Sequence, residues 1–239
     1  MEDIDAIAVL RDPVRRRLYE YVAAQGREVS RNEAAEAAGV ARTLAAHHLD
    51  KLTDAGLLEC GSRRLTGRSG PGAGRPAKVY TRARDERSVS LPARDYRTAA
   101  ELLAEAAEQA GLDAGLCAAA YRRGEALRGT SAPCGGLEEA MEVLAARGYE
   151  PHVERVAGVR DAEAVEEATG VAARVVRMRN CPFHAVAERF PPLVCGMNLA
   201  LLEGLLGADG PLRARMDPRP GECCVVVETS KTMDVDIEK

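Results

Sequence analysis

The fold of the N-terminal third is decided by residues 30–58, which read SRNEAAEAAGVARTLAAHHLDKLTDAGLL. Ser30 and Glu33 have the spacing of a capping box, in which each side chain satisfies a free backbone N–H at the start of a helix. Gly39 then interrupts the alanine-rich run, since glycine readily takes the positive φ that a tight turn needs. The sequence therefore predicts two helices, the second over 41–55, on either side of a turn.

Two helices joined by such a turn resemble a helix-turn-helix, whose second helix enters the major groove of DNA. Small Ala35 lets the helices cross closely, and Val40, Ala45 and Leu49 are expected to fill the core between them. Base edges are met near the start of the second helix. We expect its outer side to present Arg42, Thr43, Ala46 and His47, and its apolar side Leu44, His48, Leu49 and Leu52.

A hairpin is predicted directly after the second helix. Leu57–Cys60 and Lys78–Thr81 read as strands, and residues 61–76 between them are rich in Gly, Arg and Pro. No acidic residue interrupts 60–84, and clustered arginine suits contact with phosphates and the minor groove. The arrangement resembles the winged helix-turn-helix regulators of the ArsR and MarR type, with a wing that carries Arg63, Arg64, Arg68, Arg75, Lys78, Arg82 and Arg84.

Charge is distributed unevenly along the 239 residues, whose formal net charge is −4. Residues 1–84 hold 15 Lys and Arg against 11 Asp and Glu, a net of +4, whereas residues 85–239 hold 18 against 26, a net of −8. This asymmetry suits a polyanion-binding head on a solvated body. No apolar run approaches the ~20 residues that span a bilayer, and the start MEDID lacks the features of a signal peptide, so we expect a cytoplasmic protein.

The remaining sequence predicts a linking helix and a mixed domain. Helical spacing over 91–110 gives an apolar stripe, which can pack on its own domain or pair with a second copy: Tyr96, Ala99, Leu102, Leu103 and Ala106. Helices are expected over 113–128, 136–147, 159–168 and 193–206, and strands over 153–156, 173–178 and 223–227. The fold class is mainly α with α+β. It comprises a winged helix-turn-helix over 1–84, a linker and dimerisation helix over 85–111, an α+β sensor domain over 112–229 and a tail over 230–239.

Seven cysteines in a cytosolic chain are expected to be reduced, so no disulfide framework is predicted. Iron–sulfur clusters take thiolates from separated segments, often beside Pro or Gly residues that shape the backbone approach. Cys181 before Pro182 and Cys195 before Gly196 fit this pattern, and Cys223 follows a glycine by two residues. The other cysteines lack partners at metal-ligand spacing and are expected to be small buried hydrophobic residues: Cys60, Cys117 and Cys134.

The chain also resembles the SufR-type iron–sulfur repressors over most of its length. The resemblance is carried by the blocks NCPFH (180–184), VCGMN (194–198) and RPGECC (219–224), and by the wing GRSGPGAGRPAKVY (67–80). It implies that an iron–sulfur cluster, 4Fe–4S in preference to 2Fe–2S, controls the operator affinity of a homodimeric repressor. The implied ligands are Cys181, Cys195 and Cys223, with His184 and Cys224 as candidates for an additional ligand.

Two further expectations concern the cysteine site and the class of function. Adjacent residues on a strand face opposite ways, so Cys223 and Cys224 are not expected to bind one cluster together. No enzyme is predicted, because the sequence has no Walker loop, no His-Glu-x-x-His and no nucleophile elbow. The expected function is transcriptional regulation at a double-stranded operator. The alternatives to a cluster are a pocket for a small organic ligand, a zinc site and a thiol-redox sensor.

Overall fold

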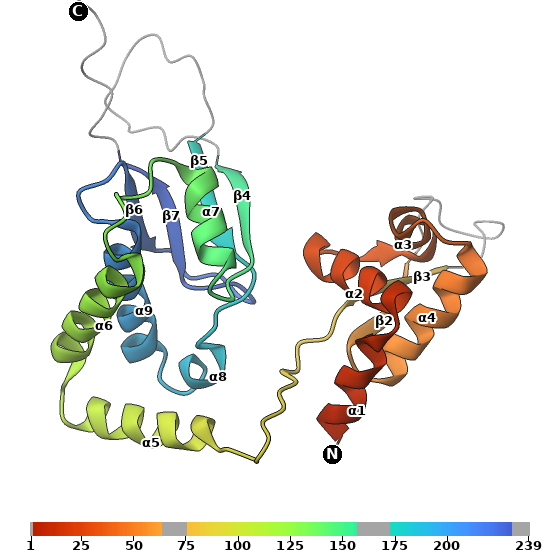
Figure 1. The fold of residues 1–239 in the computed structure, drawn as a ribbon, viewed down its shortest axis with the longest axis horizontal. Helices are drawn as coiled ribbons and strands as arrows, with labels where there is room; N and C mark the ends of the chain where they lie inside the picture. The colour runs from red at the N-terminus through yellow and green to blue at the C-terminus, as the bar shows by residue number, and fades with distance from the viewer. Residues whose placement is uncertain (1, 64–75, 157–172, 231–239) are drawn as a thin grey trace, which may run out of the picture. The chain divides into compact units, whose positions relative to one another are not determined.

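The computed structural model describes residues 2–63, 76–156 and 173–230. Contacts within the chain define two compact units, Met1–Arg94 and Asp95–Lys239. Each unit is described by itself below (Figure 1). No helix in the described ranges has the length and apolar character needed to cross a membrane.

The first unit combines short helices with a small antiparallel sheet. In chain order its elements are α1 (Glu2–Ala8), a 3-10 turn (Val9–Arg11), α2 (Pro13–Gln25), β1 (Val29–Ser30), α3 (Arg31–Ala38), α4 (Arg42–Asp54), β2 (Leu58–Arg63) and β3 (Ala77–Arg82). The strand order is β1-β3-β2, and both pairings are antiparallel. Helices α2, α3 and α4 and the sheet enclose one apolar core, which includes Leu18, Val22, Ala35, Leu49, Leu52 and Tyr80.

Local signals in the sequence determine the helix boundaries of this unit. The capping box is present, with the Glu33 backbone N–H donating to Ser30 Oγ at 3.2 Å and the Glu33 side chain accepting from the Ser30 backbone. Gly39 ends α3 with φ of 65°, the left-handed conformation predicted for the turn. One expectation is wrong: Leu44 is 42% exposed and lies outside the apolar side of α4.

The first unit extends beyond residue 84, where the sequence placed the end of the head. Arg87 pairs with Asp3 at 3.0 Å. Its guanidinium also lies 2.8 Å from the position that a side-chain carbon on Gly56 would take. These contacts fold the chain after β3 back onto the first helix, so the boundary between the units falls at Arg94.

The second unit places helices on a four-stranded antiparallel sheet. Its elements are α5 (Tyr96–Gln109), α6 (Asp113–Arg128), α7 (Leu137–Ala145), β4 (Pro151–Val156), β5 (Ala173–Met178), α8 (His184–Ala187), α9 (Pro191–Leu206), β6 (Leu212–Met216) and β7 (Val225–Thr229). The strand order is β4-β5-β7-β6. Side chains of α7 and α9 share a core with one face of the sheet, including Leu144, Val176, Leu202, Leu205, Val225 and Val227.

Helices α6 and α9 cross with their backbones in contact (Figure 1). A side-chain carbon built on Gly124 would lie 2.2 Å from the Leu201 carbonyl oxygen, and one built on Gly204 would lie 2.2 Å from the Tyr121 carbonyl oxygen. Only glycine allows this approach. The crossing therefore sets the position of α9, which carries part of the cysteine site.

Several element boundaries differ from the sequence-based expectation. Helix α5 starts at Tyr96 and not near residue 91, because the Asp95 side chain caps it by accepting the Thr98 backbone N–H at 2.9 Å. Strand β7 starts at Val225, two residues later than predicted. Strands β1 and β6 and helix α8 were not predicted. The helix expected over 159–168 lies outside the described residues.

Candidate nucleic-acid interface and cysteine site

The outer side of α4 carries the residues predicted to meet DNA. Arg42, Thr43 and His47 are exposed, and Ala46 is half-buried. Within the described part of the chain, Arg42 forms no ion pair with another residue. Its guanidinium at the first turn of α4 is therefore free to reach an acceptor outside the protein, such as the O6 and N7 atoms of guanine.

A polar cluster anchors α4 to the hairpin. Asp50 Oδ1 accepts from Lys78 Nζ at 3.0 Å and from the buried Tyr80 hydroxyl at 3.3 Å. Arg31 on α3 donates to the same hydroxyl at 3.1 Å. The hydrogen bond and charge of Asp50 raise the pKa of Lys78. These polar contacts therefore hold α4 in a defined position on β3.

Two cations of the predicted wing are engaged within the unit. Lys78 pairs with Asp50, and Arg63 pairs with Glu28 at 3.0 Å, although both cationic side chains remain more than half exposed. Of the other wing residues of the prediction, Arg82 is half-buried and Arg84 is exposed, whereas Arg64, Arg68 and Arg75 lie outside the described residues.

In the second unit, the ends of two neighbouring strands bring Cys181 and Cys223 together. Cys181 follows β5 and Cys223 precedes β7, and the Cys223 backbone N–H donates to the Met178 carbonyl at 2.9 Å. Their thiols lie close enough for each to shift the pKa of the other. Two segments 42 positions apart in the sequence thus meet at one edge of the core.

The sulfur of Cys223 is surrounded by hydrogen-bond donors. The Cys181 thiol has the largest effect, and Asn198 Nδ2 donates at 3.3 Å. The backbone N–H groups of Val225 and Cys224 contribute as well. Together they outweigh burial and lower the pKa of Cys223 to about 7. The pKa of Cys181 is raised, first by its hydrogen bond with Cys223 and then by burial.

Cys195 and Cys224 form a second pair beside the first. Burial, followed by the Cys224 thiol, raises the pKa of Cys195 to about 12, and Cys223 also acts on it electrostatically. The expectation that Cys223 and Cys224 point to opposite faces of a strand does not apply, because both precede β7. Cys223 faces Asn198 and Cys224 faces Cys195, and these two partners lie one turn apart on α9.

We define the cysteine site as Cys181, Cys195, Cys223 and Cys224, and the remaining candidate ligand, His184, pairs with Glu188 instead. The His184 side chain is 64% exposed and its Nε2 lies 3.1 Å from Glu188. Cys134 is buried in the core, Cys117 is half-buried, and Cys60 is exposed, contrary to the expectation of burial. Among the described residues, no group of three His, Cys, Asp or Glu side chains is arranged to hold a single metal ion.

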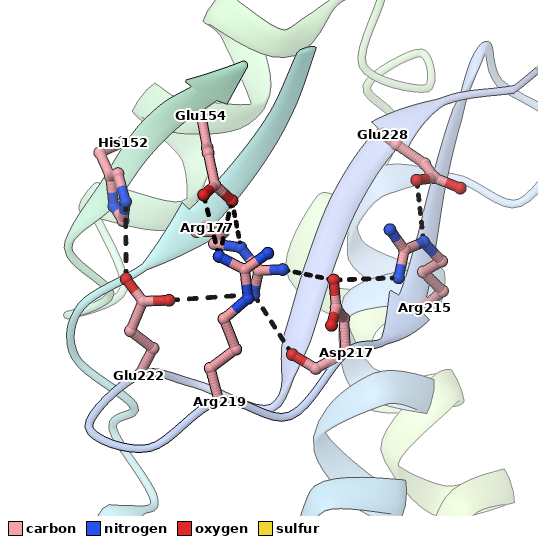
Figure 2. Close-up of polar contacts among 8 residues, drawn as sticks. All are labelled: His152, Glu154, Arg177, Arg215, Asp217, Arg219, Glu222 and Glu228. Atoms are coloured by element: carbon pink, nitrogen blue, oxygen red, sulfur yellow. Dashed lines mark hydrogen bonds and ion pairs between the residues drawn. The ribbon is translucent and has the colours of Figure 1, made fainter. Parts of the chain in front are cut away.

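An ion-pair network on the other face of the sheet holds the segment that carries Cys223 (Figure 2). Arg177 on β5 is 1% exposed, and its guanidinium binds Glu154 Oε2 at 2.6 Å and both the carboxylate and carbonyl of Asp217. Glu222 Oε2 lies 3.8 Å from it. Asp217 and Glu222 belong to the β6–β7 connection, so Arg177 ties that connection to β5.

Further charges extend the network and keep its carboxylates ionised. Arg219 bonds Glu154 at 2.9 and 3.0 Å, and these contacts, with those of Arg177, lower the pKa of Glu154. Burial opposes ionisation of Asp217, but Arg177 and Arg215 outweigh it and lower its pKa. A buried arginine is therefore compensated by several partners, as burial of a charge requires.

The sequence analysis missed three residues that build or support the cysteine site: Asn198, Tyr149 and Arg177. Asn198 interrupts the otherwise apolar helix 193–206, which is a signal that the sequence does contain. Tyr149 and Arg177 carry no such signal, because their partners are distant in the chain. A buried polar side chain is informative only once its partner is known.

Comparison with known proteins supports the assignment of the first unit. Residues 10–61 match the family model described as a helix-turn-helix domain. The search of curated proteins found no match, and the search of solved structures found none either. The protein thus contains a helix-turn-helix domain, and this domain indicates a DNA-binding transcription regulator.

Replacement of the buried arginine tests the network. Arg177→Met should destabilise the second unit by roughly 3 kcal/mol, because it leaves partly buried carboxylates without their counter-charge. Hydrogen exchange of peptides from β5 and β7, measured by mass spectrometry, should then be faster. The contribution of Glu154 and Asp217 is present at neutral pH and should be lost as the pH falls through their depressed pKa values.

Arg174→Met is the matched control, since Arg174 lies on the same strand in an exposed pair with Glu138. Its effect should stay below ~1 kcal/mol. If the β5 and β7 peptides exchanged hydrogen equally fast in the two variants, the Arg177 network would contribute no more to stability than a surface ion pair.

Proposed function

We propose that the protein is a homodimeric winged helix-turn-helix repressor whose affinity for its operator is controlled by an iron–sulfur cluster. The DNA-binding part is supported by the family match and by the exposed Arg42, Thr43 and His47 on α4. The β2–β3 pairing after α4 supports the assignment of a wing. The cluster part is carried by one observation, the convergence of four cysteines from three segments on a group of N–H donors.

The donor set fits an iron–sulfur cluster. Such clusters are held by thiolates, and hydrogen bonds from N–H groups to the sulfurs tune them. The backbone N–H of Val225 acts on the sulfur of Cys223, and the backbone N–H of Phe183 acts in the same way on the sulfur of Cys181. These donors favour the thiolate form of Cys223, whereas Cys181 and Cys195, whose pKa values are raised, would lose their protons on binding iron. Cys181, Cys195 and Cys223 would hold the cluster. The charge of the cluster, and whether it is present at all, would then depend on oxidants and on the supply of iron.

For the additional ligand the geometry favours Cys224 over His184. Cys224 shares a hydrogen bond with Cys195, whereas the His184 imidazole faces Glu188 on the surface of α8. A single tetrahedral zinc requires sulfurs closer together than a four-iron cluster does, because each bond is only ~2.3 Å long.

Helix α9 offers a physical path from the cysteine site to α5. Cys195 follows Leu193 and Val194, which pack with Phe190 against Ala104 and Ala107 on the inner side of α5. Arg189, two residues before α9, forms an ion pair with Glu101 on α5. Because α9 is held against α6, loss of the cluster would shift these two helices together and thereby move α5.

The outer side of α5 is the proposed contact with a second copy. The predicted stripe is solvent-exposed in the single chain, with Tyr96 at 74%, Leu102 at 62% and Leu103 at 72%. Ala99 and Ala106 are exposed beside them. A single helix-turn-helix reads only a half-site, and a two-fold dimer reads a palindromic operator. Pairing of two α5 helices would bury this stripe and connect the cysteine sites to the spacing of the heads.

The DNA interface is tested at Arg42. Arg42→Ala should weaken binding to an operator found by in vitro site selection by about 5- to 150-fold, the range for a lost bidentate base contact, with a smaller loss on random DNA. Arg174→Ala removes the same charge from the second unit and should leave both affinities unchanged. Equal weakening on operator and random DNA would limit Arg42 to phosphate contact.

The proposed dimer contact is tested at Leu103. Leu103→Lys should convert the protein from dimer to monomer by light scattering, because it places a charge in the middle of the apolar stripe. Glu105→Lys makes a charge change two residues away on the same helix, outside the stripe, and should remain dimeric. A wild-type protein that is monomeric at the same concentration would contradict the proposed dimer.

The cluster is tested by anaerobic reconstitution and by analysis of iron and sulfide. Ser at Cys181, Cys195 or Cys223 should abolish the visible absorption of a cluster, and Cys224→Ser should weaken it. His184→Ala, Cys117→Ser and Cys134→Ser should leave it intact. Zinc in place of iron and sulfide would favour the zinc sensor. Absence of any metal would favour a sensor of a small organic ligand or of thiol oxidation.

A further inference from the structure

A buried polar chain leads from Tyr149 through Asn198 to Cys223. The Tyr149 hydroxyl lies 2.5 Å from Asn198 Oδ1, and Asn198 Nδ2 lies 3.3 Å from Cys223 Sγ. Tyr149 is 4% exposed, Asn198 1% and Cys223 3%. The three residues come from the connection between α7 and β4, from α9, and from the residues just before β7. The chain is therefore assembled only by the tertiary fold.

The cost of burying this amide implies a specific role. Asn198 lies on a helix that otherwise faces the core with apolar residues, among them Leu202, Leu205 and Leu206. An amide removed from water without partners is destabilising, whereas an apolar side chain of the same size would stabilise the core. The two hydrogen bonds offset this cost, and one of them ends on the sulfur of a proposed cluster ligand.

The tyrosine determines which way the amide points. A hydroxyl can donate to Oδ1, and that contact leaves Nδ2 directed at the sulfur. Burial raises the pKa of Tyr149, so its proton is retained at physiological pH. With Oδ1 occupied, the amide presents an N–H donor to Cys223 and not an acceptor. The orientation of Asn198 thus depends on a hydroxyl 49 positions away in the sequence.

We propose that Asn198, oriented by Tyr149, sets the reduction potential of the bound cluster through its hydrogen bond to the sulfur of Cys223. This inference rests on the proposed function, because it requires the cluster. An N–H donor withdraws electron density from a ligating thiolate, stabilises the reduced cluster and raises its potential. Asn198 and Tyr149 are positioning residues, since both act through Cys223.

The donors are distributed unequally among the cysteines. Cys223 accepts from the amide of Asn198 and from the backbone N–H groups of Val225 and Cys224, whereas Cys181 accepts from the backbone N–H of Phe183. The donors at Cys223 therefore stabilise added negative charge most strongly on its side of the cluster. Asn198 is the only side-chain amide among these donors, so it can be removed without altering the backbone.

Redox titration of the full-length reconstituted protein, followed by its visible absorption, tests the proposal. Asn198→Leu keeps the size of the side chain and removes the donor, so the midpoint potential should fall. Tyr149→Phe removes only the hydroxyl and should lower the potential by a smaller amount, because Asn198 loses its fixed orientation. In the double variant the potential should equal that of Asn198→Leu alone, since Tyr149 acts only through Asn198.

Asn180→Ala is the matched control. Its amide donates to the Gly148 carbonyl at 2.7 Å and lies beside Cys181 in the sequence, but it has no bond to a sulfur. Its potential should be that of the wild type. A wild-type potential in Asn198→Leu would overturn the proposal. If that variant does not fold, an unshifted potential in Tyr149→Phe overturns it instead.

The same experiment separates this inference from the function on which it rests. Wild-type protein that takes up no iron and sulfide would overturn both. Wild-type protein that binds a cluster, with variants that bind it at an unchanged potential, would overturn only the role of Asn198.

Discussion

The backbone contact between α6 and α9 is the constraint on which the second unit depends. Two glycines, Gly124 and Gly204, let the helices approach until a single methyl group would meet a carbonyl oxygen at 2.2 Å. This contact leaves little freedom for α9 to slide or rotate over the sheet. Because Cys195 and Asn198 both project from α9, the crossing also sets where they meet the cysteines at the strand ends. The packing of α9 on α6 therefore determines where two residues of the candidate cysteine site lie.

Ion pairs hold the connection between β6 and β7, which carries Cys223 and Cys224. Cys181 lies three residues after the end of β5, whereas Cys223 belongs to a connection of eight residues between β6 and β7. Arg177 fixes this connection from the opposite face of the sheet through Asp217 and Glu222. The Cys223 backbone also bonds the end of β5. An irregular segment thereby gains a defined position, as a ligand-bearing loop must have if its sulfurs are to meet one cluster.

In the first unit, too, ion pairs and hydrogen bonds fix the position of a candidate functional element. Asp50 holds α4 on β3 through Lys78 and Tyr80, while Arg42 at the start of the helix forms no ion pair with the described residues. The charges that position α4 are thus satisfied inside the unit, and the charge at its first turn faces outward. The proposed base-reading role would need this division, because base contacts discriminate only when the helix is held in a fixed orientation.

The sequence by itself determined the features that arise between near neighbours. The Ser30–Glu33 capping box and the turn at Gly39 were predictable, because hydrogen bonds and φ preferences within a few residues decide them. The tertiary structure decided the surroundings of Cys223. Asn198 lies 25 positions from it and Tyr149 lies 49 positions from Asn198, and no local pattern encodes such distances. Burial, and with it the need for a partner, exists only after the chain has folded.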